Sequence, residues 1–85
     1  MTTTTTLTGQ AEALFVSSLQ PSDHPTAAEV AAAIEGSMVT FGGLWGCAAA
    51  LAAEYGEHPE TAAARMRWAL SLATTTSAPL AMAAA

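Results

Sequence analysis

The feature that most constrains the fold is the stretch from Gly36 to Ala53, which contains no charged side chain. A continuous uncharged segment of this kind is expected to be buried, either in a protein core or in a lipid bilayer. Its length lies at the lower limit for a membrane-spanning helix, and Glu35 and Glu54 flank it instead of lysine or arginine. We therefore expect a segment of soluble core. A small membrane-associated or secreted peptide is an alternative use of the same stretch.

The composition favours helices over strands. Alanine dominates the chain and only 6 % of residues are aromatic, which suits closely packed helices and leaves little material for a sheet. At 85 residues the chain fits one small domain with a marginally sufficient core. We predict an all-α fold, a compact bundle of about four short helices. A homo-oligomer or a protein partner is expected to cover the remaining apolar surface.

The N-terminal part of the chain contains the first predicted helix. Residues 1–7 are rich in threonine, lack apolar periodicity and are predicted to form a disordered lead. The helix is expected to begin at Thr8 and to end by Gln20, because Pro21 disfavours helical geometry in the residue before it. The side chains expected to face the core are those of Ala11, Leu14, Phe15 and Leu19.

The second predicted helix has the clearest boundaries in the sequence. Thr26 and Glu29 stand three residues apart, the spacing of a capping box, in which each side chain pairs with the other residue's backbone N–H. Gly42 and Gly43 are expected to stop the helix. Its core-facing side chains recur at helical spacing, at Val30, Ile34, Met38 and Phe41.

Two further helices are predicted in the C-terminal half. The third runs from about Leu44 to Tyr55, with Gly56 in the left-handed conformation that often follows a helix. Pro59 suits the first position of the fourth helix, and residues 74–85 form a flexible tail after a single domain at 8–73. The expected core residues are Leu44, Cys47 or Ala48, Leu51 and Tyr55 in the third helix, and Met66, Trp68, Leu70, Leu72 and Ala73 in the fourth.

Residues 51–70, LAAEYGEHPETAAARMRWAL, have the layout of two helices joined by a turn that contains glycine. The first half resembles the helix-turn-helix of GntR-type regulators, and the second half is similar to region 4 of extracytoplasmic-function sigma factors. These resemblances imply DNA binding, with Thr61 at the start of a recognition helix and Arg65 and Arg67 near phosphates or bases. The whole chain is also similar to small helical proteins of actinobacteria with L-Q-P-S-D, G-C-A and H-P-E-T-A motifs, which implies no function.

The charge of the chain disfavours nucleic acid as a partner. The formal net charge is −5, and Arg65 and Arg67 are the only arginine or lysine residues. An acidic surface is repelled by phosphate backbones and by anionic membranes. We therefore predict a non-catalytic regulatory or adaptor domain that works through protein contacts, and keep a helix-turn-helix transcription regulator as the alternative.

A small-residue motif lies inside the uncharged stretch and indicates self-association. Gly42, Gly46 and Ala50 recur every four residues, which on a single helix would allow a second helix to approach closely. Trp45 lies beside this motif and is a candidate anchor for an interface.

The residues that commonly carry chemistry have no supporting pattern. His24 and His58 each stand beside a proline, and Cys47 lies among alanines, with none of the paired spacings of a zinc site. We predict no enzyme activity, no metal site and no cofactor. A single cysteine cannot form an internal disulfide, so the cytoplasm is the expected compartment.

Overall fold

The computed structural model describes the backbone of residues 3–84 and the side chains of residues 7–76. Within those limits it contains helices and turns but no strand, which confirms the predicted all-α fold. The elements, in chain order, are α1 (Thr3–Phe15), the short 3-10 helix η1 (Pro21–Asp23), α2 (Ala27–Phe41), α3 (Leu44–Glu57) and α4 (Pro59–Ala84).

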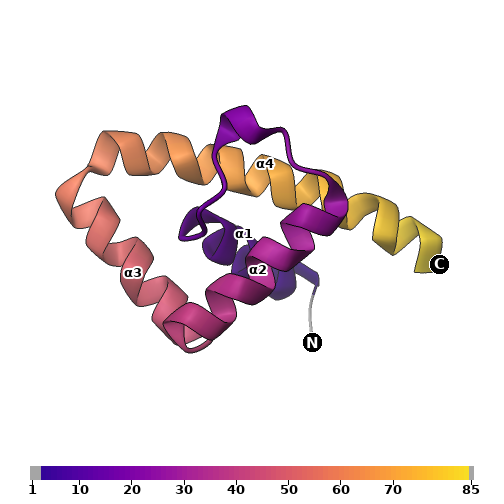
Figure 1. Ribbon diagram of the computed structural model, residues 1–85, viewed down its shortest axis with the longest axis horizontal. Helices are drawn as coiled ribbons and strands as arrows, with labels where there is room; N and C mark the ends of the chain where they lie inside the picture. Colours follow the sequence, from indigo (N-terminus) through magenta and orange to yellow (C-terminus); the bar gives the residue numbers. More distant parts are fainter. Residues whose placement is uncertain (1–2, 85) are drawn as a thin grey trace.

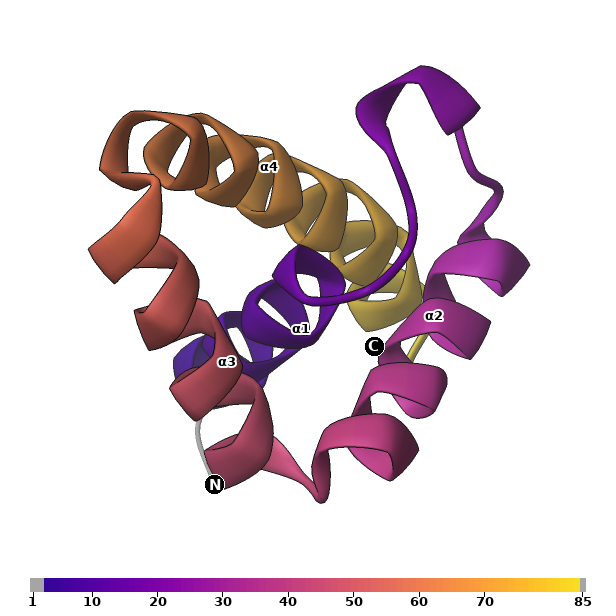
Figure 2. The ribbon, with the colours of Figure 1, turned by 60° about the vertical axis from the view of Figure 1, so that its left-hand side comes forward.

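Helix α1 is the central element. Figure 1 and Figure 2 show it enclosed by the other three helices, and it packs against each of α2, α3 and α4. The predicted core positions Ala11, Leu14 and Phe15 are buried, as is Ala13. Leu19 lies beyond the end of the helix and packs against the core from there. The hydrophobic core is therefore built around one short helix.

The bounds of α1 differ from those predicted. The structure begins the helix at Thr3 and ends it at Phe15, whereas the sequence favoured a start at Thr8 and an end near Gln20. Threonine has a low intrinsic helix propensity, but the preference is weak and does not exclude a helical start at Thr3. Met1 and Thr2 of the predicted disordered lead lie outside the described residues.

The second helix begins as predicted. The Thr26 hydroxyl accepts a hydrogen bond from the Glu29 backbone N–H at 3.2 Å, and the Glu29 carboxylate accepts one from the Thr26 N–H at 2.8 Å. Together they satisfy two donors that a helix N-terminus leaves free. Val30 is buried and Ile34 packs against the core, while Phe41 is only partly covered.

A chain of polar contacts joins three of the helices. The buried hydroxyl of Ser37 in α2 donates to the Ala13 carbonyl oxygen of α1 at 2.7 Å. The Cys47 thiol of α3 donates in turn to the Ser37 carbonyl oxygen at 3.7 Å. Cys47 is fully buried, which decides the predicted choice between Cys47 and Ala48 in favour of the cysteine. These bonds set the register of α2 and α3 relative to α1.

The two glycines after α2 turn the chain through a right angle. Gly42 and Gly43 have positive φ values of 80° and 97°, a region that side chains disfavour, and the N–H groups of both donate to the Met38 carbonyl oxygen. Helices α2 and α3 consequently meet at 90°. The uncharged stretch is thus divided between two helices at this corner.

Gly46 makes that corner possible. A β-carbon at this position would collide with the backbone carbonyl group of Phe41 at the end of α2. The missing side chain lets the first turn of α3 lie directly against the last turn of α2. Gly46 therefore serves the fold within one chain.

The junction of α3 and α4 differs from the predicted turn. Gly56 remains helical, and α3 continues to Glu57, so the left-handed conformation predicted for Gly56 was wrong. The turn falls on His58, with φ −138° and ψ 67°, and α4 begins at Pro59 as predicted. The following proline disfavours helical geometry at His58, which explains why the break occurs there.

Helix α4 packs mainly through alanines. Ala62, Ala69 and Ala73 are buried, whereas Leu70, predicted to face the core, is 40 % exposed. Leu44 in α3 was likewise predicted to be buried and is 47 % exposed. Small side chains let α4 lie close to α1, and the partly buried Met66, Trp68 and Leu72 pack against the edge of the same core.

The structure also continues α4 past the predicted end of the helix. It reaches Ala84, and the hydroxyls of Thr75 and Thr76 donate to the carbonyl oxygens of Ser71 and Leu72 at 2.8 and 2.9 Å. Such bonds allow threonine to remain in a helix. Ala85 lies outside the described residues. The division of the chain into segments 1–7, 8–73 and 74–85 stays a prediction.

Two glycine substitutions separate the roles of these positions. We expect Gly46→Ala to lower the free energy of unfolding by about 1 to 3 kcal/mol, because the new methyl group meets backbone that cannot move freely. Gly56→Ala, in a helical position with open space around it, should raise it by about 0.5 to 1 kcal/mol. Urea unfolding followed by circular dichroism measures both. Equal effects of the two changes would contradict the geometry of the corner.

Candidate binding surfaces

The side chain of Arg65, from α4, ends at the C-terminus of α1. Its Nε donates to the Phe15 carbonyl oxygen at 2.6 Å, and its Nη2 donates to those of Ser17 at 2.9 Å and Leu19 at 2.8 Å. The Leu14 carbonyl oxygen lies 3.4 Å from the same Nη2. These oxygens belong to the last turn of a helix and the loop after it, where backbone partners run out. Arg65 therefore caps α1 from a distant part of the chain.

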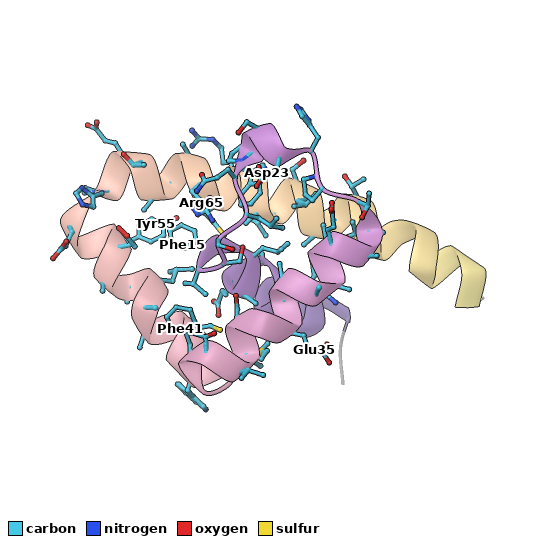
Figure 3. The ribbon with its side chains drawn as sticks, in the orientation of Figure 1. Phe15, Asp23, Glu35, Phe41, Tyr55 and Arg65 are labelled. Carbon is cyan, nitrogen blue, oxygen red and sulfur yellow. The ribbon has the colours of Figure 1, made fainter. Side chains whose placement is uncertain are left out.

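Aromatic rings surround the same guanidinium group (Figure 3). Its Cζ lies 4.7 Å from the centre of the Trp68 ring and 5.8 Å from that of Phe15. The Phe15 ring stacks in turn on Tyr55 of α3, with the ring centres 5.9 Å apart. Burial lowers the pKa of Arg65, and the nearby carboxylate of Glu54 opposes that shift. One cation thus joins α1, α3 and α4.

An open cavity of about 810 Å³ lies beside this contact, between α3 and α4. We call it the α3–α4 groove. The apolar residues that line it are Phe15, Val16, Phe41, Ala50, Ala53 and Ala62. Alanine on both α3 and α4 leaves this volume unfilled, since larger side chains at the same positions would occupy it.

The groove has an acidic rim. Glu54 and Glu57 of α3 line it together with His58. The Oε1 atom of Glu57 lies 3.9 Å from Nε2 of His58, and both side chains are largely exposed. Arg65 also borders the groove, but its donors are directed at carbonyl oxygens of its own chain. The rim therefore presents more negative than positive charge to an incoming molecule.

The corner between α2 and α3 forms a second exposed surface. Trp45 is 90 % exposed and Val39 is 81 % exposed, and the partly exposed Leu44 stands between them in the sequence. We call Val39, Leu44 and Trp45 the corner patch. A tryptophan so fully in water is costly to leave unpartnered, because burying its large ring is favourable.

The residues predicted to form a small-residue interface are separated by the fold. Gly42 ends α2, Gly46 faces the Phe41 carbonyl group, and Ala50 lines the α3–α4 groove. They do not share a continuous helix, because the chain turns between Gly42 and Gly46. Trp45 is the member of the predicted set that lies fully on the surface.

The residues that the helix-turn-helix resemblance singles out all lie on α4, but in different surroundings. Thr61 is exposed in the first turn of the helix, at the edge of the groove, and Arg67 is exposed further along. Arg65 is half-buried against α1. A guanidinium group with these internal partners has few donors left for a phosphate.

The residues considered for catalysis or metal binding are apart from one another. Cys47 is buried, while His24 and His58 are exposed in separate connectors. In the part of the chain that the structure describes, no three histidine, cysteine, aspartate or glutamate side chains are close enough to share a metal ion.

The capping role of Arg65 was not predicted, although the sequence contains a signal for it. Arg65 stands three residues after Ala62 and four before Ala69, both of which are buried. It therefore falls on the inward face of α4. Alanines give only a weak hydrophobic pattern. The predicted core-facing side of α4 was therefore assigned from the more hydrophobic Met66 and Leu70, which lie on the neighbouring face.

No single helix among the described residues is long and apolar enough to cross a membrane. Helices α2 and α3 satisfy that criterion only as a pair, bent by 90° at the corner. Comparisons of the chain with protein-family models, with curated proteins and with solved structures found no match.

The contact between Arg65 and α1 is tested by comparing the two arginines of α4. Arg65→Ala should lower the free energy of unfolding by about 2 to 3 kcal/mol, because it leaves the carbonyl oxygens of Phe15, Ser17 and Leu19 without this donor. Arg67→Ala removes the same charge from an exposed site and should change stability little. Chemical denaturation of both variants gives the comparison. A similar loss in each would mean that only the overall charge matters.

The buried thiol predicts how stability depends on pH. Burial raises the pKa of Cys47, and the negative charge of Glu12 adds to the shift. The thiol of the unfolded chain ionises near pH 8.5, whereas the folded one stays protonated to higher pH. This contribution to stability is complete below about pH 8.5 and is lost as the pH rises through the folded pKa. Cys47→Ala should show a smaller fall in unfolding free energy between about pH 7.5 and 9.5. If the unfolding free energy of Cys47→Ala falls as much as that of the natural chain, Cys47 is not the cause of the fall.

Proposed function

We propose that this chain is a non-catalytic adaptor domain that works through protein contacts and associates with itself through the corner patch. The observation that supports the proposal is the exposure of Trp45 and Val39 at the right-angled corner of an uncharged stretch. Large apolar side chains left exposed near one bend of the chain are typical of surfaces that another protein covers.

The charge distribution favours the corner patch over the rest of the surface for self-association. The chain has a net charge of −5, so two copies repel each other over most of their surfaces. The residues between Gly36 and Ala53 carry no charge, and two corners can therefore meet without bringing carboxylates together. Three side chains cover less than the roughly 800 Å² per partner of a standard interface, so we expect a weak, concentration-dependent association.

The internal hydrogen bonds of Arg65 favour the adaptor proposal over DNA binding. Arg65 is committed to the end of α1, which leaves Arg67 as the exposed arginine of α4. Tight binding to DNA normally requires several cations on one face. The helix-turn-helix resemblance stays a prediction.

Sedimentation velocity over a range from micromolar to millimolar protein tests the self-association. We expect the weight-average mass to rise with concentration for the natural chain and for Leu70→Ser, which removes a partly exposed leucine from α4. Trp45→Ser should abolish the rise, because it removes the most exposed large side chain of the corner patch.

A photo-crosslinking amino acid at position 45 tests contacts with other proteins, with the same reagent at the exposed Glu35 as the control. Crosslinks specific to position 45 are expected in the cell that makes the protein. A chain that stays monomeric at millimolar concentration and gives no such crosslink would contradict the proposal.

A further inference from the structure

The α3–α4 groove has the properties of a receptor for a helix. Its two walls are helices that meet at His58 and diverge from there, as Figure 1 shows. The end of α1 forms its floor, and the accessible Val16 and Phe41 have its largest apolar side chains, because Phe15 is almost fully buried. A third helix packs readily between two diverging helices, because its side chains fit between those of both walls.

The polar groups of the groove indicate which ligands it does not suit. Arg65 is the main cation beside it, yet this side chain already donates to the carbonyl oxygens of Phe15, Ser17 and Leu19. Among the described side chains, no buried nitrogen or oxygen lacks a hydrogen-bond partner. The Nε and Nη2 donors of Arg65 are therefore already used within the chain, which leaves fewer of its N–H groups for an anion.

The rim determines the sign of the charge that fits. Glu54 and Glu57 stand along the α3 wall, and the exposed Glu60 follows at the start of α4. The groups that oppose this negative charge are Arg65, which lies near Glu54, and His58, whose Nε2 lies 3.9 Å from the Glu57 carboxylate. A ligand with cationic groups along its edges would gain favourable electrostatic energy and a faster association.

We propose that the α3–α4 groove binds an amphipathic helix of a partner protein, with the partner's apolar side chains on Val16 and Phe41 and its lysine or arginine residues beside Glu54 and Glu57. A second copy of this chain does not meet this description. It contains two arginines, and one of them is used internally, so none of its helices has a cationic face. The groove is separate from the corner patch, and an adaptor with both could hold a partner while it self-associates.

The probe for this proposal is a fluorescently labelled peptide of about four helical turns, with leucines along one face and lysines along the other. A second peptide with glutamate in place of every lysine is its matched control. We expect fluorescence anisotropy to show micromolar binding of the lysine peptide, weakened by salt, and no binding of the glutamate peptide.

Two matched pairs of variants locate the binding site. Ala53→Arg places a bulky cation in the groove and should weaken binding of the lysine peptide at least about tenfold, while Ala52→Arg adds the same charge outside the groove and should not. Glu54→Gln should weaken it about threefold, and Glu35→Gln, on the far part of α2 in Figure 3, should leave it unchanged. The substituted side chains are exposed, so all four variants should fold like the natural chain.

The proposal is overturned if the glutamate peptide binds as well as the lysine peptide. It is also overturned if Ala52→Arg weakens binding as much as Ala53→Arg, or Glu35→Gln as much as Glu54→Gln, because the attraction would then come from overall charge. Trp45→Ser should bind the lysine peptide normally, which makes this result independent of the corner patch. Loss of binding in Trp45→Ser would place the peptide at the corner and refute the groove as its site.

Discussion

The structure depends on one cation that completes the end of its central helix. Helix α1 is in contact with the other three helices, and its last turn leaves carbonyl groups that have no partner within the helix. Arg65 suits this task, since a planar guanidinium group has several donors in a fixed arrangement and can also stack on an aromatic ring. The contact joins positions about fifty residues apart and so fixes α4 relative to α1. The floor of the α3–α4 groove follows from that placement.

The small side chains of the core explain why such polar contacts matter here. Ala62, Ala69 and Ala73 let α4 approach α1 closely, but each buries less apolar area than a leucine would. The free energy from burial is correspondingly modest, and hydrogen bonds that define one register have a larger share in specifying the fold. The hydrogen bonds of Ser37 and Cys47 join α1, α2 and α3. Those of Arg65 join α1 and α4 in the same way.

Helix α3 links the two surfaces that we propose for binding. Its first turn follows the glycine corner and exposes Trp45, while its later turns present Ala53 and Glu54 to the groove. The first surface is uncharged and convex, and the second is hollow with an acidic rim. Surfaces of such different character suit different partners, which is the property that an adaptor domain needs.

The boundaries that depend on local chemistry were predictable from the sequence. The Thr26 and Glu29 capping box, the stop at Gly42 and Gly43 and the start at Pro59 each involve residues that contact their immediate neighbours. The buried face of α1 at Ala11, Leu14 and Phe15 was predictable for a similar reason, because large and small apolar residues recur there at helical spacing.

The remaining features were decided by contacts between distant segments. A glycine at position 56 is compatible with a turn or with a helix, and the proline three residues later, with packing of α3, selects the helix. The spacing of Gly42, Gly46 and Ala50 predicts one continuous surface. The right-angled corner between α2 and α3 places these residues apart. The sequence by itself determined an all-α chain, both ends of α2 and the starts of α3 and α4, because those follow from capping, glycine and proline chemistry. Only the tertiary structure decided that Arg65 caps α1 and that Trp45 faces water, since both depend on which helices lie side by side.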